Sequence, residues 1–159
     1  MTDADIASQQ AIRAVITREF PDHGFLGEEA SDFSQLEETY CWVVDPLDGT
    51  TNYVHGFPCY GVSVAVAKDG QVVAGGVFDP TRNELFLAGA AQGATLNGKA
   101  FHTSDTSKLE DGLVAVSFPP QMTVDMPDIR AFLNVASHCR AVRRTGSAAL
   151  NLAYVACGR

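Results

Sequence analysis

The segment Tyr40–Asn52 reads YCWVVDPLDGTTN. Its first five residues form an unbroken apolar run, which is typical of a β-strand buried on both faces. Such a strand would deliver Asp45 at its end. Pro46 has no backbone N–H, so we expect the strand ladder to stop there and a tight turn to connect Asp45 to Asp48.

The same segment carries the atoms of a metal and phosphate site. The carboxylates of Asp45 and Asp48 and the carbonyl of Leu47 form an all-oxygen ligand set, which suits Mg²⁺, or Mn²⁺, rather than zinc. The run Gly49–Thr51 is expected to open a helix, whose first backbone N–H groups bind phosphate well. Asp-Gly-Thr alone is a common turn, but the whole octet Asp45–Asn52 after an apolar strand favours the site.

Two further acidic positions are candidates for the same chemistry. Glu28 and Glu29 follow Gly27 at the end of a short predicted strand, where adjacent carboxylates repel one another unless a cation compensates. The alternative is a solvated acidic loop. Asp5 lies in the first turn of a predicted helix, where the helix dipole favours an acidic residue in any case.

A second candidate loop is Arg144–Ala149, a predicted strand-to-helix transition rich in small residues. Its backbone groups are placed to line a pocket, and the alternative is that Ser147 simply caps the helix. For His55, just past the octet, a packing or surface role is favoured over catalysis. The chain contains no Gly-x-Ser-x-Gly elbow, so covalent serine catalysis has no support.

The remaining pattern predicts a single α+β domain over residues 1–159. We expect helices over residues 4–19, 128–138 and 147–156, and a polar loop over 30–39. We expect strands over residues 25–26, 40–44, 60–67, 72–78, 84–88, 94–96, 113–117 and 141–144, with turns at 68–71 and 97–98. Hairpins segregated from helices indicate a layered α+β fold.

Composition narrows the class of partner and the compartment. The 159 residues have a formal net charge of −8, which disfavours a nucleic-acid partner. No apolar run is long enough to span a bilayer, and residues 1–10 lack the basic stretch of a secretory signal, so a cytoplasmic location is expected. The four cysteines are scattered, without the spacing of a zinc site, and are expected to be free thiols.

These residues together resemble the inositol monophosphatase family of lithium-sensitive, magnesium-dependent phosphatases. Asp45–Gly56 is similar to the family's first signature almost residue for residue. Gly27-Glu28-Glu29 resembles its upstream acidic motif, Thr2-Asp3-Ala4-Asp5 its early Thr-x-x-Asp element, and Gly146-Ser147-Ala148-Ala149 its small-residue substrate loop. The octet is highly specific, and the other three motifs follow in the expected order and spacing.

The resemblance implies a role for each matching position. Metal ligands would be Glu28, Asp45, Asp48 and the Leu47 carbonyl; Asp48, Gly49, Thr50 and Thr51 would hold the phosphate; Gly146, Ser147 and Ala148 would contact the alcohol part of the substrate. Thr50 with Asp5 would orient or deprotonate the attacking water, with Glu28 assisting through a metal ion. The resemblance also implies an αβαβα sandwich and a homodimer.

The family pattern includes segments that this chain lacks. A downstream Trp-Asp-x-Ala-Ala-Gly signature, whose aspartate completes the second metal site, would lie beyond Arg159, and a first helix and a lysine loop would precede Met1. We therefore expect the N-terminal-to-middle part of such a phosphatase, incomplete at the C-terminus. Because the second metal site has only Asp45 and Asp48, we expect the isolated chain to be weak or inactive.

The sequence leaves several functions open. The leading expectation is hydrolysis of a small phosphate monoester by metal-activated water. Inositol monophosphate comes first because Asn52 follows Thr-Thr as in the monophosphatase branch, and fructose bisphosphate and histidinol phosphate are alternatives. A relative that binds the transcription machinery without catalysis is the competing class. A truncated product that folds poorly is the third.

Overall fold

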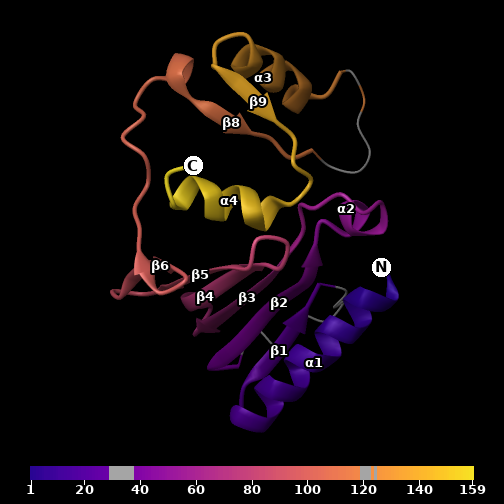
Figure 1. The fold of residues 1–159 in the computed structure, drawn as a ribbon. Coiled ribbons are helices and arrows are strands. Elements are labelled where there is room, and N and C mark those ends of the chain that lie inside the picture. The colour runs from indigo at the N-terminus through magenta and orange to yellow at the C-terminus, as the bar shows by residue number, and fades with distance from the viewer. Residues whose placement is uncertain (29–37, 119–122, 124) are drawn as a thin grey trace.

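The computed structural model describes residues 1–28, 38–118, 123 and 125–159. Five layers are stacked in Figure 1: helix α1 (Asp3–Glu19), a seven-stranded sheet, helix α4 (Ala148–Ala156), a two-stranded sheet, and helix α3 (Pro127–Ala136). This is the α+β, αβαβα arrangement predicted from the sequence. Glu29 lies outside the described residues, and so does most of the predicted loop over 30–39.

The large sheet follows chain order, and only its first pair of strands is parallel. Its strands are β1 (Gly24–Gly27), β2 (Tyr40–Asp48), β3 (Gly61–Lys68), β4 (Gln71–Asp79), β5 (Glu84–Gly89), β6 (Gly93–Leu96) and β7 (Lys99–Ala100). The β3–β4 hairpin turns at Asp69 and Gly70, whose φ angles of 48° and 75° are those of the expected tight turn. The sequence pattern did not predict β7, which has only two residues.

Strand β2 is longer than predicted, because Pro46 does not end it. Asp45 pairs with Ser63 and Asp48 pairs with Gly61, so three steps on β2 oppose two on β3. The extra residue forms a bulge, where a proline is tolerated because the ladder needs no N–H there. The expected tight turn between Asp45 and Asp48 is therefore wrong, and the motif is a bulged strand end.

Helices α1 and α4 begin at side-chain caps. Thr2 and Asp5 form a complete capping box at the start of α1, and Ser147 caps α4. The short helix α2 (Thr50–Val54) follows directly on the octet, as predicted. The second sheet consists of β8 (Leu113–Ala115) parallel to β9 (Ala141–Arg143), and β8 is preceded by a 3₁₀ turn at Leu109–Asp111 that the pattern did not predict.

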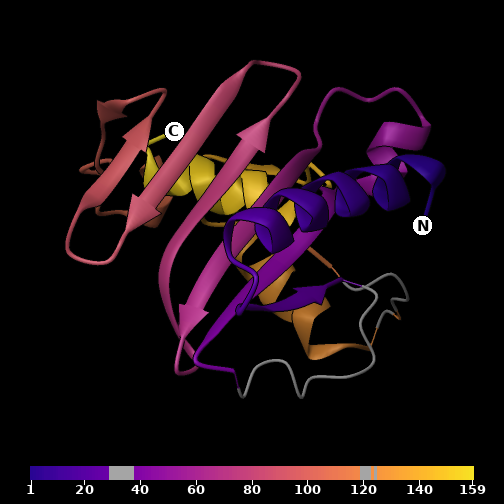
Figure 2. The ribbon, with the colours of Figure 1, turned by 90° about the horizontal axis from the view of Figure 1, so that it is seen from below.

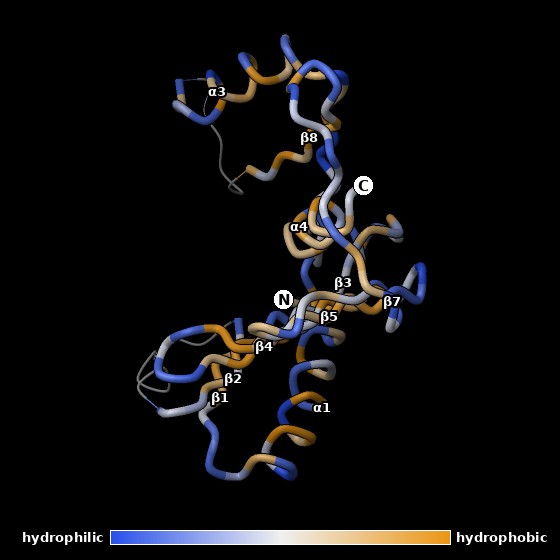
Figure 3. Tube along the Cα trace, turned by 90° about the vertical axis from the view of Figure 1, so that its left-hand side faces the viewer, coloured by the Kyte–Doolittle hydropathy of each residue, from blue (hydrophilic) through white to orange (hydrophobic). Residues whose placement is uncertain are grey.

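The two faces of the large sheet are covered unequally. Helix α4 packs on β3 and β4, whereas α1 packs on β2 on the opposite face, as Figure 2 shows. Among the described residues, no helix covers the part of that second face over β3–β5. We call it the open face; it is lined by Val62, Val64, Phe78, Leu85 and Leu87. Figure 3 shows apolar residues concentrated in the strands and in α4.

Other sequence predictions concern the thiols and the membrane. All four cysteines are free, as predicted, and Cys41 and Cys59 are buried. Within the described part of the chain, no helix combines the length and the apolar character that a membrane crossing requires.

Candidate active site at the end of strand β2

The octet turns sharply at Gly49, between the end of β2 and the start of α2. Gly49 has a φ of 92°, and a Cβ atom there would lie 3.0 Å from the carbonyl oxygen of Cys59. A glycine is thus required both for the left-handed conformation and for the close approach of the next loop. The turn brings Thr50 back toward Leu47 and toward the start of α1.

Thr50 and Asp5 meet at this turn, as the resemblance implied. The Thr50 hydroxyl lies 3.2 Å from Asp5 Oδ1 and 3.0 Å from the Leu47 carbonyl oxygen, so its one proton has two acceptors. The other Asp5 oxygen, Oδ2, accepts from the backbone N–H of Thr2 at 2.5 Å and from its hydroxyl at 2.6 Å. Asp5 is buried at 5% exposure, so the helix cap also fixes a carboxylate beside the octet.

The surroundings of Asp5 keep it ionised. Burial by itself raises the pKa of this carboxyl, but hydrogen bonds from Thr2 and then from Thr50 outweigh burial and lower the pKa below its ordinary value. The hydrogen bonds that Asp5 accepts in its ionised form, taken together, therefore decide the direction of its pKa shift.

The pKa of Asp45 is shifted in the opposite direction from that of Asp5. Burial, followed by the negative charges of Glu28 and Asp48, raises its pKa to about 6, against the hydrogen bond that its Oδ1 accepts from the Leu47 N–H at 3.1 Å. Glu28 is brought to this position by the parallel β1–β2 pair, in which Gly27 pairs with Val44. Glu28 and Asp45 thus follow equivalent positions of neighbouring strands, and like charges accumulate around Asp45.

Asp48 is held by the start of α4. Its Oδ2 accepts from the Ser147 hydroxyl at 2.5 Å and from the Ala149 N–H at 2.7 Å. Ser147 is fully buried, whereas Gly146 and Ala148 are exposed. The Ser147 hydroxyl is therefore directed at Asp48, and a substrate contact in this loop is open to Gly146 and Ala148.

The site residues fit a hard divalent cation in chemistry and charge. Carboxylates and a carbonyl are the oxygen ligands that Mg²⁺, Mn²⁺ and Ca²⁺ prefer, and the raised pKa of Asp45 marks a place where positive charge would be stabilised. Among the described residues, no three His, Cys, Asp or Glu side chains lie close enough together to hold a metal ion. A bound cation would have to draw these mutually repelling carboxylates together, so the ligand set stays a prediction.

A cleft of about 670 Å³ opens beside Asp48, Thr51 and Asn52 of the octet. Its walls come from the octet and α2, from the segment after β8, and from the β9–α4 loop. They include Asp48, Thr51, Asn52, Phe57, Ser117, Phe118, Arg144, Gly146 and Ala148. The Arg144 guanidinium lies 5.5 Å from the centre of the Phe118 ring. Of the predicted phosphate-binding and substrate-loop residues, Asp48, Thr51, Gly146 and Ala148 line this cleft, whereas Gly49, Thr50 and Ser147 do not.

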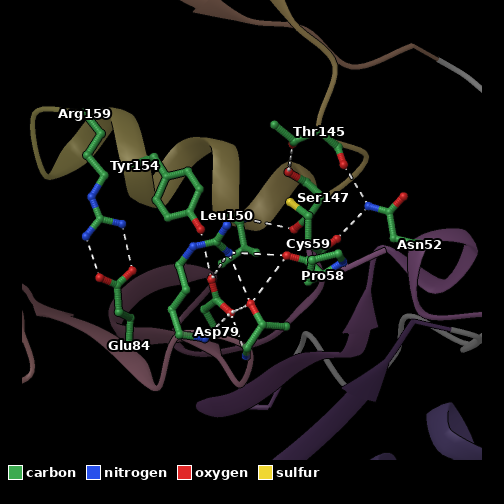
Figure 4. A network of polar contacts seen from close by, with 12 residues as sticks. Asn52, Pro58, Cys59, Asp79, Glu84, Thr145, Ser147, Leu150, Tyr154 and Arg159 are labelled. Atoms are coloured by element: carbon green, nitrogen blue, oxygen red, sulfur yellow. Dashed lines mark hydrogen bonds and ion pairs between the residues drawn. The ribbon is translucent and has the colours of Figure 1, made fainter. Parts of the chain in front are cut away.

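Asn52 has a structural role that the sequence did not predict. Asn52 Nδ2 lies 2.6 Å from the Cys59 carbonyl oxygen and 2.7 Å from that of Thr145, which ties α2 to the β9–α4 loop (Figure 4). Gly146, with a φ of 86°, leaves the room that Asn52 fills. An asparagine after Thr-Thr carries no local sign of such a bridge. His55 is exposed, in line with the surface role preferred for it.

Known proteins resemble this chain over its whole length. The model of the inositol monophosphatase family matches residues 1–159. A protein named Nus factor SuhB from Pasteurella multocida (strain Pm70) is 41% identical over 160 residues, which cover 100% of this chain and 60% of the relative. The chain thus spans about three fifths of the length of this curated relative.

Solved structures share the fold as well as the sequence. The structure of inositol monophosphatase from Anabaena (Nostoc) sp. PCC 7120 superposes with a TM-score of 0.90 and 40% identity, covering 98% of this chain and 62% of that one. A calcium-bound structure of a family protein from Staphylococcus aureus gives a TM-score of 0.86 and 26% identity, covering 99% and 58%. With the family match over all 159 residues, the chain belongs to the inositol monophosphatase family.

Proposed function

We propose that these residues form the phosphate-transfer part of a magnesium-dependent phosphatase that hydrolyses a small phosphate monoester, with inositol monophosphate as the first candidate. The observation that carries the proposal is the hydrogen bond between the Thr50 hydroxyl and the ionised Asp5 carboxylate. It lies in the same octet as Asp45, whose pKa is raised by burial and by the negative charges of Glu28 and Asp48. Because the chain spans about three fifths of its relative, the proposal is made for the full-length protein.

The proposed ligands of one divalent cation are Glu28, Asp45, Asp48 and the Leu47 carbonyl, with Mn²⁺ as an alternative to Mg²⁺. When bound, such a cation supplies charge stabilisation for the phosphoryl group and lowers the pKa of a coordinated water. Phosphate monoesters hydrolyse very slowly without a catalyst, so electrostatic stabilisation of this size is needed. The donor chemistry at the end of β2 supports this assignment.

Thr50 and Asp5 are proposed to handle the proton of the attacking water. Asp5 Oδ2 is fully used by Thr2, so Oδ1 is left for the Thr50 hydroxyl. A threonine hydroxyl that donates to a buried carboxylate presents its lone pairs to a water molecule and orients it. Glu28, at the end of β1, is proposed to assist from the metal side.

The phosphate and the alcohol are proposed to occupy the two ends of the cleft. Gly49, Thr50 and Thr51 lie at the start of α2, where free N–H groups and the absent Cβ of Gly49 suit a phosphate. The alcohol would then extend toward Gly146, Ala148 and the Arg144–Phe118 pair, which line the same cleft. The exposed positions of Gly146 and Ala148 support this placement.

A phosphate-release assay tests the proposal. The full-length protein is incubated with Mg²⁺ and, in turn, with inositol monophosphate, fructose bisphosphate and histidinol phosphate, and an EDTA-treated sample is the control. We expect metal-dependent release that is fastest with inositol monophosphate. Release from none of the three esters would reject the phosphatase class, and a different preferred ester would correct the substrate.

A second candidate function is binding to the transcription machinery without catalysis. Its support is the 41% identity to a protein named as a Nus factor, together with a net charge of −8 that suits a protein partner better than nucleic acid. Co-sedimentation of the purified chain with purified bacterial RNA polymerase tests it. The absence of a stoichiometric complex at micromolar concentrations would count against this function.

A cytoplasmic location and a homodimer complete the proposal. Both rest on the resemblance to the inositol monophosphatase family. Analytical ultracentrifugation of the full-length protein measures its oligomeric state, and a single species at monomer mass would reject the homodimer.

A further inference from the structure

The Asp48 carboxylate receives both of its described hydrogen bonds on one oxygen. Oδ2 accepts from the Ser147 hydroxyl at 2.5 Å and from the Ala149 N–H at 2.7 Å. No described residue donates to Oδ1. Two donors on one oxygen fix the rotation of a carboxylate about its terminal bond, and they leave the other oxygen for a different partner.

The Ser147 hydroxyl has a single arrangement that satisfies its neighbours. Its oxygen accepts from the Leu150 N–H at 3.2 Å, which caps α4, while its only proton goes to Asp48. Ser147 is fully buried, so water does not compete for either bond.

Asp45 is oriented differently from Asp48, although both belong to one motif. The Asp45 carboxylate accepts from Leu47, two residues away, so local chain geometry places it. The donors to Asp48 come from residues 99 and 101 positions later. One carboxylate of the octet therefore depends on the position of a distant helix.

Helix α4 is fastened at both ends, so its donors are in a fixed place. At its start, Asn52 holds the Thr145 carbonyl at 2.7 Å. Farther along, the Tyr154 hydroxyl donates to buried Asp79 at 2.9 Å, and Arg159 forms two hydrogen bonds to Glu84, as Figure 4 shows. A helix held in this way can transmit its own position to Asp48.

We propose that the start of α4 is a positioning element of the metal and phosphate site, in which Ser147 and the Ala149 N–H hold Asp48 through Oδ2 and leave Oδ1 for a divalent cation. The role of Asp48 as a metal ligand rests on the proposed function, whereas the hydrogen bonds from Ser147 and Ala149 to Asp48 are independent of it. Ser147 is thus a positioning residue, and its hydroxyl is not a substrate contact.

The test is the substitution Ser147→Ala in the full-length protein, with Tyr154→Phe as the matched control. Each removes one hydrogen-bonded hydroxyl, at the N-cap of α4 or within the helix, but of the two only Ser147 contacts Asp48. Binding of Mn²⁺ is measured directly by electron paramagnetic resonance, and thermal stability is measured alongside. We expect Ser147→Ala to weaken Mn²⁺ binding about 10- to 100-fold, the usual effect of removing a group that orients a metal ligand.

The control separates positioning from simple loosening of α4. Tyr154→Phe is expected to lower the melting temperature while Mn²⁺ affinity stays within about twofold of the wild type. Ser147→Thr, which keeps the hydroxyl, is expected to restore affinity at least in part. Equal Mn²⁺ affinity in wild type and Ser147→Ala would overturn the proposal and leave Ser147 as a helix cap only.

Failure of the proposed function gives a different result. If the wild-type protein binds Mn²⁺ and hydrolyses no ester, the effect of Ser147→Ala on binding still decides the positioning role. If the wild-type protein binds no Mn²⁺ at all, both the metal site and the positioning role are overturned.

Discussion

Thr50 is the side chain at which the start of α1 and the end of β2 meet. Its hydroxyl contacts Asp5 and the Leu47 carbonyl, and its neighbours in the octet are the proposed metal ligands. The residue combination Asp5 and Thr50 was predicted from the sequence only through family resemblance, because 45 positions separate them. At the residue scale, the proposed chemistry therefore depends on one short side chain.

Replacing Thr50 with valine tests this dependence. Valine has the same shape without the hydroxyl, so we expect kcat for the preferred ester to fall about 10²- to 10⁴-fold, the range attributed to a positioned proton-transfer group. Unfolding free energy should fall by only about 1 kcal/mol, because one hydrogen bond is lost. Thr50→Ser is the control and should keep most of the activity. Equal activity in Thr50→Val and wild type would contradict the assignment.

Asp45 gives a pH-dependent prediction. Its pKa is raised from 3.8 to about 6 in the folded chain. The protonated form is therefore favoured by folding, and its stabilisation is fully present below pH 3.8 and is lost as pH rises through about 6. In EDTA, we expect the contribution of Asp45 to decline by roughly 3 kcal/mol over this window, at 1.36 kcal/mol per pKa unit.

Asp45→Asn should remove this decline, because an amide does not ionise. Denaturant melts in EDTA at pH 4 and pH 7 measure the difference between the variant and the wild type. The variant is expected to be the more stable of the two at pH 7 while it loses Mn²⁺ binding. Parallel pH profiles for the two proteins would show that Asp45 is not the group responsible.

Elements that rest on local pattern were predicted well, and those that rest on distant contacts were not. Helix α1, the β3–β4 hairpin and the start of α2 follow from periodicity, from Asp69-Gly70 and from Gly49. The bulge at Pro46 was wrongly predicted as a turn, because its existence depends on pairing with β3. The Ser147–Asp48 contact was not predicted either, since nothing near either residue encodes its partner.

Asp79 is a further element-scale feature that the sequence did not reveal. It precedes Pro80 at the end of β4 and reads as an ordinary turn residue, but it is fully buried. It accepts from Thr81, Arg82 and Tyr154, which joins the β4–β5 turn to α4 (Figure 4). Burial raises its pKa, but these hydrogen bonds outweigh burial and lower it.

Asp79→Ala should therefore loosen α4. The substitution leaves the Tyr154 hydroxyl without its acceptor and Arg82, which is 46% exposed, without its ion-pair partner, so we expect the unfolding free energy to fall by about 1–3 kcal/mol. Because the folded pKa is lowered, the stabilisation by Asp79 is present above its ordinary pKa of 3.8 and is lost as pH falls through the folded value. Urea unfolding at pH 7 and pH 3 checks both points, and an unfolding free energy unchanged from wild type at pH 7 would contradict them.

At the scale of the whole molecule, the open face is the main departure from a closed core. Leu85 and Leu87 are 38% and 47% exposed on it, whereas Phe86 between them points to α4 and is 4% exposed. An apolar surface of this kind favours self-association.

Leu87→Lys tests the exposure of this face. We expect the variant chain to bind less of the dye ANS and to aggregate at higher concentration than the wild-type chain, because a charge interrupts the apolar surface. The matched control is Leu109→Lys, at a leucine of similar exposure, 44%, in the 3₁₀ turn. If both variants lower ANS fluorescence equally, the effect belongs to net charge and not to the open face.

The bond between Asp48 and Ser147 closes a span of 99 residues. Closing a flexible loop of that length costs about 4 kcal/mol of chain entropy, so the contact forms only once the intervening strands have assembled. At a synthesis rate of about 5–20 residues per second, roughly 5 to 20 s separate the emergence of the two residues from the ribosome. The octet therefore exists in the nascent chain before α4. If Asp48 binds a cation in the proposed way, that cation is loaded after synthesis has passed α4.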